Sequence, residues 1–217
     1  MDTFETLIFV PEGTLLNEKL AERTALRQTL KYFNHDFGPD DRLKYTDLSS
    51  NFKLITSEQR IALLVQNFLP NEPTAESYFY EQLSKQNRLI KGSLNFLDTI
   101  KGKITLASYG KENKTNLLPR LKNADIADKF EALFFADDFS TELPDKKIFT
   151  TIVQQLDCDP DTTLVVGATL SDEIQGAENA NLKSLWIAPK REKIPITPHP
   201  TLHLSRLTDL LFYLNIE

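Results

Sequence analysis

Side chains that could carry out chemistry follow three apolar runs of the sequence. Glu12 comes two residues after the first run, Ser108 directly follows the second, and Asp172 and Glu173 come shortly after a later one. Carboxylates that converge could act as general acids or bases or hold a cation weakly, Glu12 and Glu173 being the candidates. A serine hydroxyl beside the N-terminus of a helix could bind an anion. The plainer alternatives are hydrogen-bonded or solvated acids and a capping serine.

The apolar runs that precede these side chains are typical of buried strands. They cover residues 7–10, 104–107, 132–136, 163–167 and 184–188, and helical periodicity fills the stretches between them. Continuous apolar strands that alternate with helices predict a parallel sheet covered on both faces. We therefore expect an α/β protein with a Rossmann-like five-stranded core flanked by helices. The carboxyl ends of its strands would share one edge, where ligands bind in open sheets of this kind.

The stretch between the first and second strands is too long for a simple crossover. Its apolar residues recur at helical spacing throughout. The sequence therefore predicts an inserted all-helical cap of residues 18–88, on an α/β core domain of residues 1–17 and 89–217.

Composition restricts the classes of function. The 217 residues hold 25 Lys and Arg against 31 Asp and Glu, and the formal net charge is −6. An acidic balance argues against nucleic acid as a partner, since nonspecific binding needs a cationic face. No apolar run approaches the ~20 residues of a membrane span, and the acidic N-terminus predicts no signal peptide. Cys158 is the single cysteine, which excludes an internal disulfide and a cysteine-based metal site. A cytoplasmic protein is the expectation.

Four segments together resemble the motifs of the haloacid dehalogenase-like (HAD) superfamily. TLIFVPEGTLLN at 6–17 resembles a strand followed by Asp-x-Asp-Gly-Thr-Leu, and ITLASYG at 104–110 resembles a strand followed by Thr/Ser-Asn-Gly. ELPDKKIF at 142–149 is similar to Lys-Pro-Asp-Pro-x-Ile-Phe. VVGATLSDEIQGAENA at 165–180 is similar to Gly-Asp-Ser followed by an acid and Gly-Ala-x-Asn-Ala. The resemblance covers nearly the whole chain. It points to the helical-cap phosphatases, the subgroup of phosphoglycolate phosphatase and beta-phosphoglucomutase.

The departures from these motifs fall on the residues that carry the family's chemistry. In the family the first Asp of motif one is the nucleophile and a magnesium ligand, and here Val10 stands there. The second Asp, the general acid/base, corresponds to Glu12, and the Asn of motif two corresponds to Tyr109. The lysine of motif three aligns with Leu143, and the metal-binding Asp after Gly167 aligns with Ala168. The vestigial positions are therefore Val10, Glu12, Ser108, Tyr109, Leu143, Ala168, Asp172 and Glu173.

These losses predict a protein without the family's phosphatase activity. An isopropyl side chain offers no nucleophilic oxygen, and magnesium needs hard oxygen ligands that Val10 and Ala168 lack. Leu143 cannot balance the charge of a phosphate. We expect no catalytic residue, no metal site and no cofactor. Lys146 or Lys147 could swing into the place of the missing lysine, although ordinary surface exposure is the simpler interpretation.

Three functions remain open at this stage. The first is a pseudoenzyme on a HAD-like hydrolase fold that binds an unknown protein partner or small molecule. The second is a hydrolase with weak or altered phosphomonoesterase activity that uses Glu12, in which case magnesium would be its cofactor. The third is a sensor whose cap closes over a remodelled pocket that holds a small ligand. Neither the partner nor the oligomeric state follows from the sequence.

Overall fold

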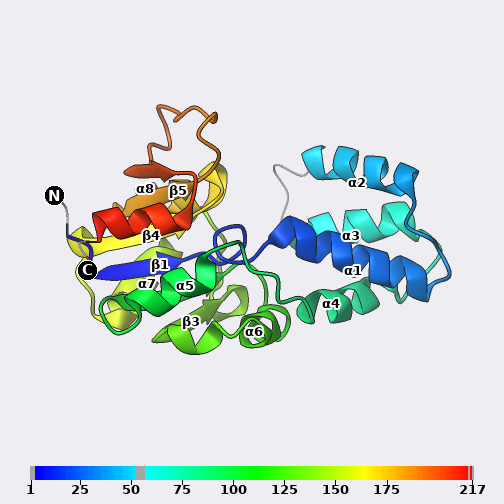
Figure 1. Cartoon of the computed structure of the whole chain (residues 1–217), viewed down its shortest axis with the longest axis horizontal. Helices are drawn as coiled ribbons and strands as arrows, with labels where there is room; N and C mark the ends of the chain where they lie inside the picture. The colour runs from blue at the N-terminus through cyan, green and yellow to red at the C-terminus, as the bar shows by residue number, and fades with distance from the viewer. Residues whose placement is uncertain (1–2, 52–56, 215, 217) are drawn as a thin grey trace.

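The computed structural model describes residues 3–51, 57–214 and 216, and its centre is a parallel sheet (Figure 1). The strands are β1 (Thr6–Phe9), β2 (Thr105–Gly110), β3 (Ala132–Phe135), β4 (Thr163–Gly167), β5 (Lys183–Ile187) and β6 (Leu202–Leu204). They lie in the order β3-β2-β1-β4-β5-β6, and every neighbouring pair is parallel. Because β1 lies between β2 and β4, the loops that follow these three strands lie together at the carboxyl ends of the strands, which we call the carboxyl edge of the sheet.

The sheet has six strands among the described residues, so the prediction of five is wrong by one edge strand. β6 is three residues long, all of them half-buried, and pairs with β5 through registers such as Trp186 with His203. A strand this short, with a histidine at its middle, does not produce a buried apolar run. The last helical segment, Leu207–Tyr213, is a 3-10 helix.

Alternate side chains of the central strand point to opposite faces of the sheet, as the two-residue period of a strand requires. Leu7 and Phe9 pack in one apolar cluster with helix α5 (Ser93–Ile100), helix α6 (Lys114–Asn123) and the C-terminal 3-10 helix. Ile8 and Val10 pack in another with α7 (Lys147–Leu156) and the short α8 (Gln175–Asn179). Helices therefore cover both faces.

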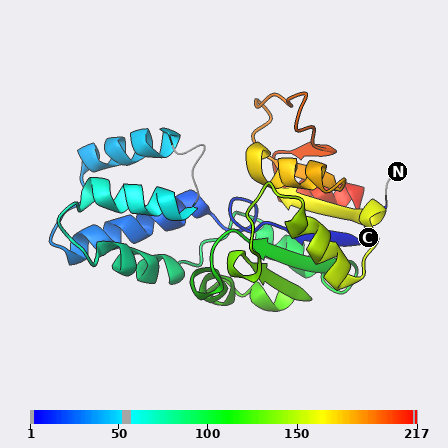
Figure 2. The same ribbon diagram turned by 180° about the vertical axis from the view of Figure 1, so that it is seen from behind.

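Four helices lie to one side of the sheet, away from the strands (Figures 1 and 2). They are α1 (Glu18–Tyr32), α2 (Pro39–Asn51), α3 (Ser57–Phe68) and α4 (Ala75–Ser84). Their buried apolar residues, among them Leu26, Leu64 and Phe79, form a cluster separate from those of the sheet. We call these helices the cap and the rest of the fold the core. The division at residues 17–18 and 88–89 remains a prediction, and residues 52–56 lie outside the described part.

The two chain segments that join cap and core lie side by side. The backbone N–H of Asn17 donates to the carbonyl of Arg88 over 2.8 Å, and Leu16 pairs with Leu89 in an isolated bridge. The Asn17 side chain accepts a hydrogen bond from the N–H of Leu20 and so caps α1. The first helix of the cap therefore starts beside the end of β1. Among the described residues, no helix is long and apolar enough to cross a membrane.

Gly167 ends β4 at a point of close packing. A Cβ atom added there would lie 2.4 Å from the Cβ of Glu173, an atom attached directly to the backbone. Only a residue without a side chain lets the turn after β4 fold back so tightly.

We predict that Gly167→Ala lowers the free energy of unfolding by about 1–3 kcal/mol, because the turn must shift to relieve the overlap. Urea unfolding measures the change. Gly38→Ala is the control, since a Cβ there would make only an ordinary contact of 3.7 Å with Asp41. Equal stability of the two variants would contradict the packing argument.

Candidate functional site

The loop after β1 brings the carboxyl group of Glu12 into the interior. Glu12 is 7% exposed. Its Oε1 accepts a hydrogen bond of 2.8 Å from the backbone N–H of Lys111, the residue that follows β2. Its Oε2 has no hydrogen-bond partner among the described residues. Burial, together with the charges of Glu112 and Glu18, raises the pKa of Glu12 from 4.5 to about 8, although the Lys111 charge acts in the opposite direction.

The cation at this edge of the sheet is Lys111, a residue that the motifs do not single out. Its Nζ lies 2.6 Å from Oε1 of the fully buried Glu173 and 3.4 Å from Oδ2 of Asp172. Burial would lower the pKa of Lys111, but the carboxylates of Glu173 and Glu12 outweigh it and hold the pKa above its ordinary value. Lys111 is therefore a permanent positive charge.

Glu173 is placed by a π-helical turn, Leu170–Ile174, that follows β4. Its Oε2 accepts a 2.6 Å hydrogen bond from the backbone N–H of Thr169, while its Oε1 faces Lys111. Asp172 is adjacent and more exposed. The structure thus brings together Glu12, Asp172 and Glu173, the three acids that the sequence analysis selected, around Lys111. Lys111 directly follows Gly110 of the second motif, but nothing in the local sequence indicates its contact with Glu173.

Val10 and Tyr109 have apolar surroundings. They stand at the positions of the family nucleophile and of the motif-two asparagine. Val10 is fully buried in the cluster that includes Phe149. The Tyr109 ring makes edge contacts with Phe139 and Phe149, and burial raises its pKa above the ordinary value. Leu143 packs on the same cluster. These side chains extend the core toward the strand ends.

The remaining predicted positions offer little to a ligand. Ala168 is half-buried, and its Cβ would lie 3.1 Å from a Cβ at Gly13. Ser108 is 1% exposed, and its hydroxyl has no hydrogen-bond partner among the described residues. Lys146 and Lys147 are exposed at the start of α7, so neither takes the place of the missing lysine.

A buried arginine ties the cap to the core. Arg120 of α6 is 1% exposed; its Nη1 lies 2.8 Å from Oε1 of Glu112, and its Nη2 lies 2.7 Å from Oε2 of Glu18 on α1. Burial opposes the charge, but the two carboxylates raise the pKa of Arg120. Burial raises the pKa of Glu112, whose Oε2 has no hydrogen-bond partner among the described residues.

A cavity of about 500 Å³ lies between cap and core at this edge; we call it the cap–core cavity. Residues of α1, α2 and α3 line one side, and the loops after β1, β2 and β4 line the other. Among them, Glu22 of α1 pairs with Arg60 of α3 over 3.0 Å and accepts a 2.7 Å hydrogen bond from Tyr45 of α2. The volume of the cap–core cavity is that of a small-molecule site.

Acids outnumber bases around the cap–core cavity. The described carboxylates that line it, or pair with a residue that does, are Glu12, Glu18, Glu22, Glu112, Asp172 and Glu173. The corresponding cations are Lys19, Arg60, Lys111 and Arg120. A phosphate dianion entering here would meet a net negative environment.

The donor set does not fit magnesium, the cofactor that the family resemblance implies. Val10 and Ala168 carry no ligand atom, and Glu173 directs one oxygen to Thr169 and the other to the Lys111 ammonium. Among the described residues, no group of three or more His, Cys, Asp or Glu could hold a metal ion. Magnesium is usually held through one or two carboxylates, and the acid that aligns with a family ligand, Glu173, already has both oxygens engaged.

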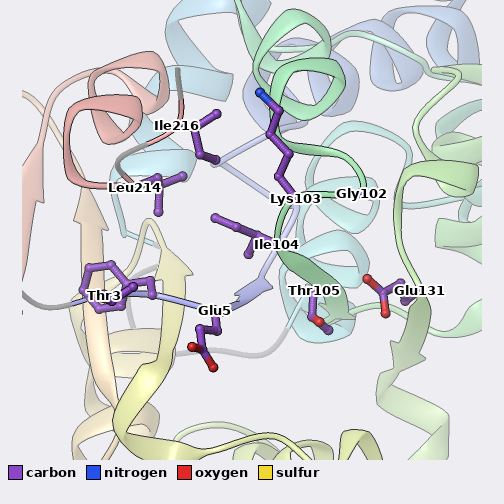
Figure 3. Close-up of a pocket in the computed structure, with 10 residues that line it drawn as sticks. Thr3, Glu5, Gly102, Lys103, Ile104, Thr105, Glu131, Leu214 and Ile216 are labelled. Carbon is purple, nitrogen blue, oxygen red and sulfur yellow. The ribbon is translucent and has the colours of Figure 1, made fainter.

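A second cavity, of about 630 Å³, lies at the opposite, amino end of the strands (Figure 3). Ile104, Leu214 and Ile216 line one part of it, and the carboxyl groups of Glu5 and Glu131 lie apart from one another. It lies away from the edge where the four motifs meet, so we do not place the functional site there.

Comparisons with known proteins agree with this architecture. The model of the haloacid dehalogenase-like hydrolase family matches residues 7–187, and the chain belongs to that family. The chain is 23% identical to YfnB of Bacillus subtilis, whose name assigns it to the HAD hydrolases, over 100% of this chain and 98% of YfnB. It is 25% identical to the pyrimidine 5'-nucleotidase PynA of Streptococcus pneumoniae, over 96% and 94% of the two chains.

Solved structures of the family share the fold. A crystal structure of YfnB bound to magnesium superimposes with a TM-score of 0.89 at 20% identity, covering 99% of this chain and 100% of that one. A Thermotoga maritima protein assigned as a beta-phosphoglucomutase gives a TM-score of 0.80 at 16% identity, covering 97% and 98%. The expected HAD fold is confirmed, with a sheet flanked by helices.

The raised pKa of Glu12 predicts how stability changes with pH. The folded protein holds this proton up to about pH 8, whereas the unfolded chain releases it near its ordinary pKa of 4.5. The stabilisation is thus complete below about pH 4.5 and is lost as the pH rises to about 8. Urea unfolding of Glu12→Gln should show a flatter pH profile over this window. The exposed control Glu192→Gln should keep the wild-type profile, and parallel curves for all three proteins would contradict the shift.

Removing the Lys111 charge should destabilise the fold by about 3–5 kcal/mol, because it leaves the buried Glu173 unpaired. Adding Glu173→Gln to Lys111→Met should recover much of the loss. Chemical unfolding of the two single variants and the double variant tests the coupling. Lys147→Met, on an exposed lysine, should change stability by less than about 0.5 kcal/mol. Additive losses in the double variant would show that the pair is not coupled.

Proposed function

We propose that this HAD-fold protein has lost phosphatase chemistry and acts by binding a small ligand in the cap–core cavity. The observation that carries the proposal is Lys111, whose ammonium lies 2.6 Å from Glu173 at the edge of the sheet where a family enzyme needs magnesium. Val10 supplies no nucleophile at the same edge. The backbone of the family is kept, and the groups that would attack, coordinate and neutralise a phosphate are replaced.

The cavity favours a ligand over a protein partner as the bound species. It is walled by three cap helices on one side and three loops on the other, and buried carboxyl groups of Glu12 and Glu112 lie in its lining. A partially enclosed space with a few convergent polar groups is typical of small-molecule sites. A change in the angle between cap and core on binding would give such a protein the role of a sensor.

A second candidate function, an altered phosphomonoesterase, is favoured by one observation. Glu12 is a buried carboxyl with a pKa of about 8, and general acids work best when their pKa lies near the working pH. Such an enzyme would need another group, or water, to attack the phosphorus, since the protonated Glu12 is a poor nucleophile.

Hydrolysis of an aryl phosphate and of a panel of small phosphomonoesters, with magnesium present, tests the proposal. We expect no turnover from the wild-type protein or from Glu12→Gln, whereas PynA on a pyrimidine 5'-monophosphate serves as the positive control. Turnover by the wild type that is lost in Glu12→Gln would overturn the proposal and support the second candidate.

A further inference from the structure

Two buried carboxyl groups of the cap–core cavity are incompletely satisfied. Glu12 and Glu112 are 7% and 6% exposed, and each has an Oε2 atom without a hydrogen-bond partner among the described residues. Both residues line the cavity. Leaving a buried acceptor unpaired costs about 1–3 kcal/mol, and more when the group is charged. When these two carboxyl groups are ionised, their free oxygens need hydrogen-bond donors or positive charge in the cavity.

The cations already present are engaged elsewhere. Arg120 forms ion pairs with both Glu18 and Glu112. Lys111 directs its ammonium to Glu173 and Asp172 and reaches Glu12 only through its backbone N–H.

Arg60 forms an ion pair with Glu22 within the cap, and the Tyr45 hydroxyl donates a hydrogen bond to the same carboxylate. Lys19 also lines the cavity, but neither it nor any other described residue forms a hydrogen bond with the Oε2 atoms of Glu12 and Glu112. A ligand can supply the hydrogen-bond donors that the described residues do not bring to these two atoms.

We propose that the cap–core cavity binds a small organic cation, a protonated primary amine, through the carboxyl groups of Glu12 and Glu112. This inference rests on the proposed function and names the chemical class of its ligand. An ammonium group has three donors and no acceptor, which matches acceptor atoms that lack partners. It also offsets the excess of acids, whereas a phosphate would add to it.

The choice of an organic amine over a metal ion follows from the geometry of the donors. A magnesium ion held by two single carboxylate oxygens would keep most of its octahedral shell as water, and such a hydrated ion gains nothing from an apolar wall. The lining also contains the apolar side chains of Leu16 and Ile90, against which a short alkyl chain can pack. A small alkylamine can pair with the carboxyl groups through its ammonium and pack against the apolar side chains through its alkyl chain.

Binding should be coupled to proton release. Glu12 is protonated at neutral pH, so it must lose its proton to form an ion pair with an ammonium. The charged and titratable groups that act on it are Glu18 of α1, Tyr109 of β2, Lys111 and Glu112 of the following loop, and Arg120 of α6. As the pH rises toward about 8, the apparent affinity for the amine should therefore increase by up to about tenfold per pH unit.

Calorimetric titration of the full chain with putrescine tests the inference. Butanediol, a neutral molecule of similar length, and inorganic phosphate are the comparison probes. We expect saturable 1:1 binding of putrescine, none of butanediol or phosphate, and uptake of the released proton by the buffer. Glu12→Gln should weaken binding at least about tenfold and remove its pH dependence.

Glu112→Gln provides a second variant, and Glu192→Gln is the matched control. Glu192 is exposed and does not line the cavity, so its variant should bind putrescine as the wild type does. Thermal unfolding of each variant establishes that it is folded.

The outcomes separate this inference from the function on which it rests. No putrescine binding, or binding that Glu12→Gln and Glu112→Gln leave unchanged, would overturn the amine proposal, and absent hydrolysis would leave the proposed function standing. Saturable phosphate binding together with turnover of phosphomonoesters would overturn both.

Discussion

The ion pair between Lys111 and Glu173 determines what the carboxyl edge of the sheet can do. A fully buried carboxylate at this position needs a positive charge beside it, and the ammonium 2.6 Å away provides one from within the chain. Because that charge is covalently attached, the turn after β4 and the loop after β2 are fixed relative to one another without a bound ion. The closely packed Gly167 allows the turn to present Glu173 in this way.

The other residues of this edge are consistent with the proposed loss of metal chemistry. Val10 carries no ligand atom, and it extends the apolar cluster below the edge. Burial and the nearby charge of Glu112 raise the pKa of Glu12 to about 8. Arg120 then balances acids of the cap and of the core. Acids outnumber bases around the cavity between them, an arrangement that suits a cation better than a phosphate.

Much of this architecture could be predicted from the sequence. The central strands carry apolar runs that end in turn signals, so their existence and direction follow from the pattern, and the four motifs identify the fold. β6 could not be predicted this way, because Leu202–Leu204 is short, half-buried and held only by pairing with β5. Lys111 was missed because its role depends on a contact with Glu173, 62 residues further along the chain, that no local pattern encodes.

If the Lys111 ammonium occupies the place of the metal ion, magnesium should find no site beside Glu173. Thermal unfolding of the wild-type protein should be followed as magnesium is raised to about 10 mM, since a ligand that binds the native state raises the melting temperature. We expect no saturable rise. A saturable rise that Glu173→Gln abolishes would show that magnesium reaches Glu173 despite the ammonium, and that Lys111 does not replace the metal ion.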